Sequence, residues 1–273
     1  MEGEHAGRRH GSRCSGRLFR RANSRDWTLF AVKLWDTESA GEQTRPLVGS
    51  NTRVSTLQNG VDSVERLVPI LGDEPMIGGT TYVVAIIARP GVIGHTGTNA
   101  RIRCGRINRH PDDVLTSYVE QIKAADIDIT LTDHILVDIW KKFVLLSGTS
   151  GITASTRQPL GVIRDDEDMR AFFYKLMRET IAVGSAAGVK FPPDFPAELD
   201  ALVGGFAPVM KASMANDLDA GNRLELEWLA GKVVALGREY GIPTPGQKAV
   251  YAILKPYRTG WDGYVSAAET SIV

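Results

Sequence analysis

The chain has 273 residues, of which 43% are apolar and 23% are charged, so it is long enough for one or two domains with a substantial core. Its 32 basic residues balance its 32 acidic residues, which excludes a strong general attraction to nucleic acid or to an acidic membrane. Two isolated cysteines exclude a disulfide scaffold, and the lack of a long apolar run or a signal peptide predicts a cytoplasmic protein with no membrane partner.

Residues 1–26 differ in composition from the rest of the chain. Seven arginines are scattered there among glycines and serines, with almost no apolar periodicity. Such a segment cannot bury enough surface to become ordered, so we expect a disordered or aberrant head. A basic arm that binds nucleic acid is the alternative.

From Trp27 the chain alternates short apolar runs with amphipathic stretches. The runs predict strands at 28–32, 53–57, 76–88, 91–95, 102–107 and 127–131, and the stretches predict helices at 36–47, 61–71 and 112–125. An alternation of this kind is typical of a mostly parallel α/β sheet. We therefore expect an α/β domain over residues 27–133.

After Asp133 the pattern becomes helical throughout. Apolar residues recur every three or four positions and predict helices at 134–146, 169–187, 197–203, 208–214, 223–240 and 247–254. The sequence thus predicts an α/β plus all-α protein, in which a helical domain over 134–273 follows the α/β domain.

Short motifs in a fixed order narrow the choice among such proteins. They are Phe30-Ala-Val-Lys33, Leu57-Gln-Asn-Gly60, Gly78-Gly-Thr-Thr-Tyr82, Pro90-Gly-Val-Ile-Gly-His95, Trp140-Lys-Lys142, Pro159-Leu-Gly161, Ser213-Met214 with Asp217, Glu225 with Gly231, and Pro243-Thr-Pro245. From about Trp27 to Tyr257, their order and spacing resemble the ketopantoate reductase family. That family reduces 2-dehydropantoate, a 2-keto acid, to pantoate with NADPH, on the route to pantothenate.

The resemblance implies roles for individual residues. Lys142 corresponds to the catalytic lysine, which gives a proton to the carbonyl oxygen as hydride arrives at carbon. Glu225 corresponds to the active-site glutamate, which contacts a substrate hydroxyl, helps hold the lysine and is also expected to contact the cofactor. Ser213 matches a substrate-binding serine. Asn59 matches an asparagine near the nicotinamide ribose and the substrate, and Lys33 a lysine near the cofactor.

Each of these residues also has a structural interpretation. Lys142 could pair with Asp138 one helical turn earlier. Ser213 could cap a helix, and Asn59-Gly60 could form an ordinary turn. Glu225 would lie on the apolar face of the predicted helix 223–240, where a carboxylate should be paired with a group elsewhere in the fold.

The chain departs from the family pattern in its cofactor motif. No GxGxxG turn follows a strand anywhere in the sequence, although such a turn carries the pyrophosphate in dinucleotide-binding domains. The strand at 28–32 aligns with the fourth strand of the family's sheet, so the Rossmann-type domain is expected to be truncated, with an unpaired strand edge. We expect weak NADPH binding by this chain alone, and a non-catalytic paralogue that acts as an interaction module is the alternative.

A second departure concerns the substrate. The family places asparagines one and two turns after the catalytic lysine, where this chain has Leu146 and Ser150. Ser150 remains a candidate substrate-binding residue, but the change favours a 2-keto acid related to 2-dehydropantoate. No metal site is predicted, and the expected partners are the small substrate and a second copy of the chain.

Overall fold

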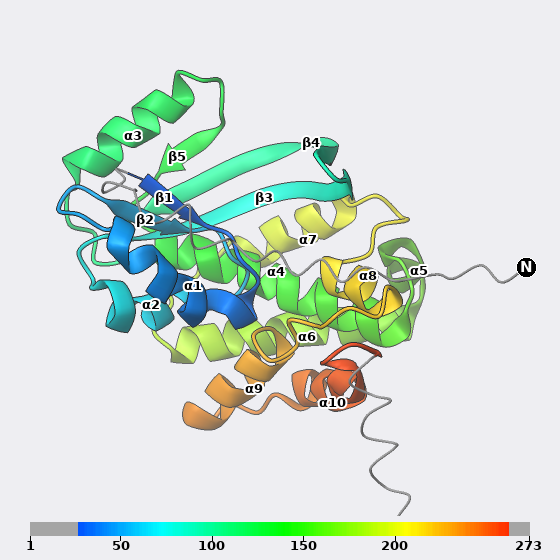
Figure 1. Cartoon of the computed structure of the whole chain (residues 1–273). Helices are drawn as coiled ribbons and strands as arrows, with labels where there is room; N and C mark the ends of the chain where they lie inside the picture. Colours follow the sequence, from blue (N-terminus) through cyan, green and yellow to red (C-terminus); the bar gives the residue numbers. More distant parts are fainter. Residues whose placement is uncertain (1–26, 262–273) are drawn as a thin grey trace, which may run out of the picture.

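The structure, a computed structural model, describes residues 27–261 except for the side chains of residues 84, 86–87 and 96–99. The prediction for residues 1–26 therefore lies outside the described residues. Within residues 27–261, an α/β part is followed by a helical part (Figure 1), which confirms the predicted fold class. No helix in this range has both the length and the apolar character that crossing a membrane requires.

The described strands form one mixed sheet in the order β1-β2-β3-β4-β5. Its strands are β1 (Trp27–Phe30), β2 (Arg53–Thr56), β3 (Met76–Arg89), β4 (Val92–Gly105) and β5 (Ile129–Leu131). The pairs β1–β2, β2–β3 and β4–β5 are parallel, and β3–β4 is an antiparallel hairpin. The parallel pairs leave the carboxyl ends of β1 and β2 at the same edge of the sheet.

The prediction of separate strands at 91–95 and 102–107 is wrong, because β4 is continuous. The polar, glycine-containing residues between them interrupt the apolar pattern, and residues 96–99 have no partner in the register, but the strand pairs with β3 on both sides of them. Ala100 and Arg101 still pair with Val83 and Tyr82 of β3, and a register shift absorbs the irregularity.

Helices cover both faces of the sheet. The 3-10 helix η2 (Leu34–Asp36), α1 (Thr37–Thr44), the 3-10 helix η3 (Arg45–Leu47) and α2 (Ser63–Leu71) follow the first two strands. The core on their side contains Val54, Leu67 and Met76. On the other face, α3 (Asp113–Lys123) packs against Ile77, next to Met76 in β3, because successive strand residues point to opposite faces.

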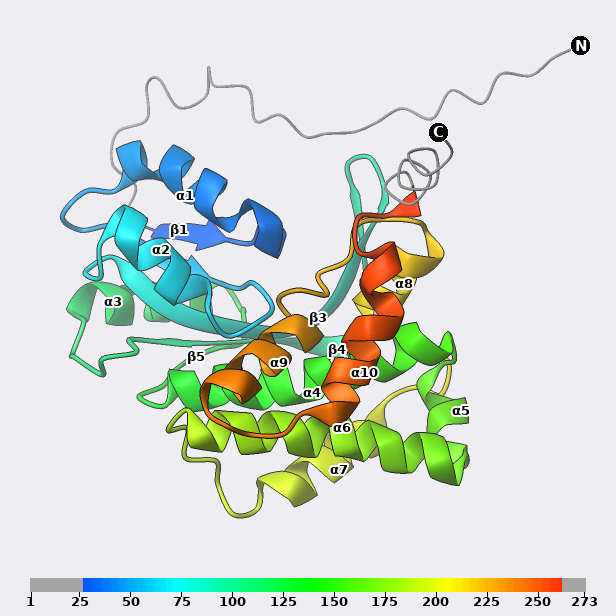
Figure 2. The ribbon, with the colours of Figure 1, turned by 90° about the horizontal axis from the view of Figure 1, so that it is seen from below.

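The helical part is built around α4 (Ile135–Thr156), which contacts α6 (Glu167–Ala186), α8 (Ser213–Asp219), α10 (Pro245–Leu254) and strand β3 (Figure 2). The remaining elements are α5 (Leu160–Asp165), α7 (Phe195–Gly205), α9 (Ala230–Glu239) and the 3-10 helix η4 (Lys255–Tyr257). Gly148 of α4 lies so close to α6 that a Cβ there would be 2.5 Å from Met177 Cγ. Small residues thus set the spacing of the two central helices.

Two helix predictions are wrong in ways that matter for the site. The predicted helix 223–240 begins only at Ala230, because the preceding residues bond to distant segments: Leu224 N donates to Arg258 O, and the Glu225 carboxylate accepts a bond from Leu34 N. The predicted helix 208–214 is replaced by α8, which begins at Ser213.

Candidate active site

Lys142 projects from the third turn of α4 and is partly buried. Burial lowers the pKa of Lys142 to about 8, and the negative charge of Glu225 opposes this shift. The alternative partner, Asp138, instead binds Arg103 of β4 at 2.9 Å. Lys142 is therefore an ammonium group in a poorly solvated place, with a carboxylate that favours its charged form.

Glu225 lies in the irregular segment between α8 and α9, and only 7% of it is exposed. Its Oε1 accepts a buried 3.1 Å hydrogen bond from the backbone N–H of Leu34, which follows β1. This bond joins the helical part to the α/β part, and it pairs a carboxylate that would otherwise be costly to bury.

Lys33 and Asn59 lie at the carboxyl ends of β1 and β2, the edge at which α/β sheets bind ligands. Lys33 Nζ is 3.0 Å from Asp217 Oδ2 of α8 and 5.6 Å from the centre of the Trp35 ring. Asn59 is partly buried and precedes Gly60, whose φ of 91° favours glycine. Lys33 thus sits where the sheet meets the helical part, and a Cβ on Gly60, the neighbour of Asn59, would lie 3.7 Å from the Trp228 carbonyl oxygen.

Ser213 and Ser150 come from neighbouring helices. Ser213 is the first residue of α8 and is exposed, whereas the capping position is Ala212, so the helix-cap interpretation of Ser213 is wrong. Ser150 is buried in α4, two turns beyond Lys142. The start of α8 lies against this end of α4, since Ala212 N is 3.3 Å from Thr153 Oγ1.

No pattern in the sequence predicts the set of cations and tryptophans around Glu225. The Arg223 guanidinium lies 4.6 Å from the centre of the Trp35 ring, and that of Arg66 lies 5.5 Å from the Trp228 ring. These contacts join residues far apart in the chain, so no periodicity predicts them. Asp217 belongs to the motif that begins at Ser213, and its bond to Lys33 depends on the fold.

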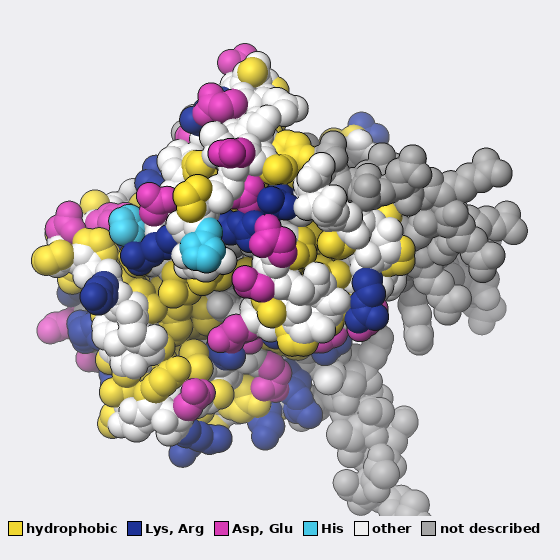
Figure 3. Space-filling model, turned by 90° about the vertical axis from the view of Figure 1, so that its left-hand side faces the viewer, with side chains coloured by type: hydrophobic (Ala, Val, Ile, Leu, Met, Phe, Trp, Pro, Cys, Tyr) yellow, Lys and Arg dark blue, Asp and Glu magenta, His cyan; other side chains and the backbone are white. Residues whose placement is uncertain are grey.

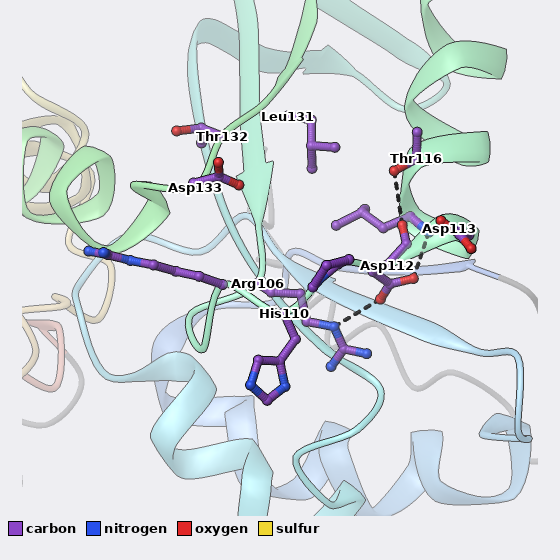
Figure 4. Close-up of a pocket in the computed structure, with 11 residues that line it drawn as sticks. Arg106, His110, Asp112, Asp113, Thr116, Leu131, Thr132 and Asp133 are labelled. Carbon is purple, nitrogen blue, oxygen red and sulfur yellow. Dashed lines mark hydrogen bonds and ion pairs between the residues drawn. The ribbon is translucent and has the colours of Figure 1, made fainter.

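A separate pocket lies between the start of α3 and the loops that follow β4 and β5 (Figure 4). Its main charges are already paired: Asp112 binds Arg106 at 2.9 Å and Arg53 at 2.6 Å, and accepts a bond from Leu115 N. Arg53 begins β2, so this pocket is at the opposite edge from Lys33 and Asn59. On the side of the molecule seen in Figure 3, basic and acidic side chains are intermixed with apolar ones.

Two models of one protein family match the chain. The model described as "Ketopantoate reductase PanE/ApbA" matches residues 12–109, and "Ketopantoate reductase PanE/ApbA C terminal" matches residues 134–258. The chain belongs to the ketopantoate reductase family. This confirms the resemblance drawn from the motifs and makes the chain a ketopantoate reductase-like oxidoreductase.

Two relatives agree with this assignment, and a further solved structure shows the same fold alone. The chain is 28% identical to a 2-dehydropantoate 2-reductase of Mesorhizobium japonicum, over 85% of this chain and 76% of the relative. A ketopantoate reductase of Ralstonia eutropha superimposes with a TM-score of 0.78 and 28% identity, over 86% of this chain and 76% of that one. A D-mandelate dehydrogenase shares the fold, with a TM-score of 0.79 and 15% identity over the same shares of the two chains.

Proposed function

We propose that this ketopantoate reductase family member reduces a small 2-keto acid, 2-dehydropantoate or a close relative, to the 2-hydroxy acid with NADPH. The observation that carries the proposal is the placement of Lys142 near Glu225, whose carboxylate is bonded to the segment after β1. A proton donor therefore lies beside the sheet edge at which this fold class binds nucleotides. The name of the Mesorhizobium relative supports the choice of substrate class.

The residues at this edge fit the nicotinamide half of the cofactor. Lys33 offers an ammonium group held by Asp217, and Asn59 offers an amide beside Gly60, whose φ is 91°. No glycine-rich turn of the GxGxxG type is present in the sequence, so the pyrophosphate half has no such cradle here. NADPH, when bound, supplies the hydride. We expect it to bind more weakly than to a protein with that turn.

The side chains of the chain would handle the proton and the substrate. The Lys142 ammonium donates a hydrogen bond to the carbonyl oxygen, stabilises the negative charge that develops there, and delivers its proton. A pKa of about 8 makes Lys142 a stronger acid than an exposed lysine while keeping it largely protonated at neutral pH. Glu225 favours the charged form and orients it.

Polar groups along α4 and α8 would hold the rest of the substrate. Ser213 and Ser150 supply hydroxyls, and Asn59 supplies an amide from the sheet edge. Leu146 lies between Lys142 and Ser150 along α4 and is partly buried. An apolar side chain in that row leaves a substrate hydroxyl unpaired, so we propose that a 2-keto acid less polar than 2-dehydropantoate is preferred.

A folded interaction module is the second candidate. The outer edge of β1 has no partner strand among the described residues, and an unpaired edge is a site for association with another chain. We also propose that the chain divides into two domains at Asp133 and that it forms a homodimer.

The first experiment is a titration with NADPH, followed by nicotinamide fluorescence. Saturable micromolar binding would support the reductase, and assays of 2-keto acids would follow. Absence of binding up to millimolar concentrations would contradict the reductase proposal and favour the interaction module.

Lys142→Met is the decisive variant in those assays. We expect kcat to fall by about 10²–10⁴-fold, because general-acid catalysis contributes about that much. NADPH binding should be retained, since Lys142 does not hold the cofactor. Lys248→Met, which removes an exposed lysine of α10, is the control. Full activity of Lys142→Met would refute its role.

A further inference from the structure

The guanidinium of Arg66 lies where the segment after β1 meets the segment that carries Glu225. Arg66 belongs to α2, and its Nη2 donates a 2.8 Å hydrogen bond to the carbonyl of Leu34. Its central carbon is 5.5 Å from the centre of the Trp228 ring. Nε and Nη2 also donate to the two carboxylate oxygens of Glu38, at 2.6 and 2.7 Å. One side chain therefore contacts both segments.

Both segments held by Arg66 are bonded directly to Glu225. Leu34, whose carbonyl accepts from Arg66, donates its own N–H to Glu225 Oε1 at 3.1 Å. Trp228 donates its backbone N–H to the backbone carbonyl of Glu225, also at 3.1 Å. Leu34 thus links the Arg66 guanidinium to the Glu225 carboxylate, and Trp228 links the same guanidinium to the Glu225 backbone. Since the Arg66 side chain is only 16% exposed, water competes little for its bonds.

We propose that Arg66 is a positioning residue that holds Glu225 near Lys142. Its kinetic consequence rests on the proposed function, whereas its effect on the placement of Glu225 concerns the folded chain alone. Lysine in its place would keep the charge but lose the planar, forked geometry that binds a carboxylate and stacks on a ring at once.

The charges around Lys142 make this role measurable. Lys141, its neighbour, forms an ion pair with Glu198 of α7, and Asp138 one turn earlier binds Arg103. Within the described residues, Glu225 is the charged group that acts on the pKa of Lys142. The pKa of Lys142 therefore reports how close the Glu225 carboxylate is.

The two ways in which Arg66 could act on Lys142 have opposite signs. Loss of a nearby cation, by itself, raises the pKa of a lysine, because a cation disfavours the ammonium form. Displacement of Glu225 lowers it, because the opposing carboxylate is gone. A positioning role for Arg66 therefore predicts a lower pKa of Lys142 in Arg66→Met.

The test measures the pKa of Lys142 in the full chain without cofactor. Lysines are methylated reductively with ¹³C-formaldehyde, the Lys142 signal is assigned with Lys142→Arg, and its chemical shift is followed against pH. We expect Arg66→Met to lower the pKa by about one pH unit, as loss of a close opposite charge does, and Arg66→Lys to lower it less. Arg45→Met, which removes an exposed arginine of the 3-10 helix η3, should leave it unchanged.

A double variant separates positioning from a general loosening of the fold. Glu225→Gln should lower the pKa of Lys142, and adding Arg66→Met to it should lower that pKa no further, because only the direct effect of the lost cation is left. An unchanged or raised pKa in Arg66→Met, together with a lowered one in Glu225→Gln, would overturn the proposal. If Arg66→Met fails to fold, Arg66→Lys carries the same test.

Turnover distinguishes this proposal from the proposed function. In an active reductase, the pH at which kcat declines should move down in Arg66→Met together with the pKa of Lys142. If the wild-type chain reduces no 2-keto acid but the NMR pattern holds, the reductase proposal fails and the positioning role of Arg66 stands.

Discussion

Lys142 can donate a proton only while its side chain is an ammonium. Because burial places its pKa at about 8, we expect kcat for 2-keto acid reduction to be highest at neutral pH and to fall as the pH rises through about 8. Glu225→Gln removes the charge that raises this pKa, so the decline should move to lower pH. The measurement is kcat against pH for both proteins, and a decline at the same pH in both would contradict the role of Glu225.

The same burial has a cost in stability. A lysine whose pKa is lower in the folded chain than in the unfolded chain, where it is about 10.4, destabilises the fold at any pH below about 8. Stability rises between these two values, because the unfolded chain binds the proton more readily. Lys142→Met should therefore raise the free energy of unfolding at pH 7 by about 1–3 kcal/mol.

Urea titrations at pH 7 and pH 10.5 test this expectation. The gain in Lys142→Met should shrink at the higher pH, where the wild-type lysine is neutral in the folded chain and about half neutral in the unfolded chain. A destabilised variant at pH 7 would mean that the packing of the lysine stem outweighs the cost of its charge.

The contact between α4 and α6 depends on the lack of a side chain at Gly148. A Cβ there would lie 2.5 Å from Met177 Cγ and 3.1 Å from the Phe173 ring. We expect Gly148→Ala to destabilise the fold by about 1–3 kcal/mol, because overpacking forces neighbours to move. Gly204→Ala in α7 is the matched control, since a Cβ there meets nothing within 4 Å. Equal effects of the two changes on the urea midpoint would refute this account.

Among the secondary-structure elements, the sequence predicts the start of α4 but not its end. Residues such as Thr149 and Thr153 weaken the apolar pattern that supports a helix only as far as Leu146. In the fold their hydroxyls donate to the carbonyls of Leu145 and Thr149, at 2.8 and 2.6 Å, so they remain compatible with a buried helix.

Before α9, the sequence pattern predicts a helix where the structure has none. The apolar spacing of Leu226, Leu229 and Val233 fits a helix, yet Leu226 and Leu229 belong to a turn. A bond between the Glu225 carboxylate and Leu34 N, 191 residues apart in sequence, holds this segment. No local pattern contains that information, so the role of Glu225 could be predicted from the family resemblance but its surroundings could not.

For the molecule as a whole, the outer edge of β1 is the feature most open to association. Leu29 of β1 is 58% exposed, and the described residues place no strand beyond it. We expect the chain to self-associate as its concentration rises, and Leu29→Lys to suppress this, because charged residues protect strand edges.

Sedimentation velocity over a range of concentrations measures that association. Val209→Lys, at an 83% exposed position between α7 and α8, is the control for added charge. Wild-type chain that stays monomeric at every concentration would show that the edge is protected.

The peptide unit that joins Lys33 to Leu34 has a thermodynamic consequence. Lys33, next to the cofactor in the proposed function, is followed by Leu34, whose N–H binds the Glu225 carboxylate. If NADPH tightens this bond, it raises the affinity for the keto acid by some factor, and the keto acid must then raise the affinity for NADPH by the same factor. Glu225→Gln should bring this shared factor close to one, the value at which the two dissociation constants are independent of each other.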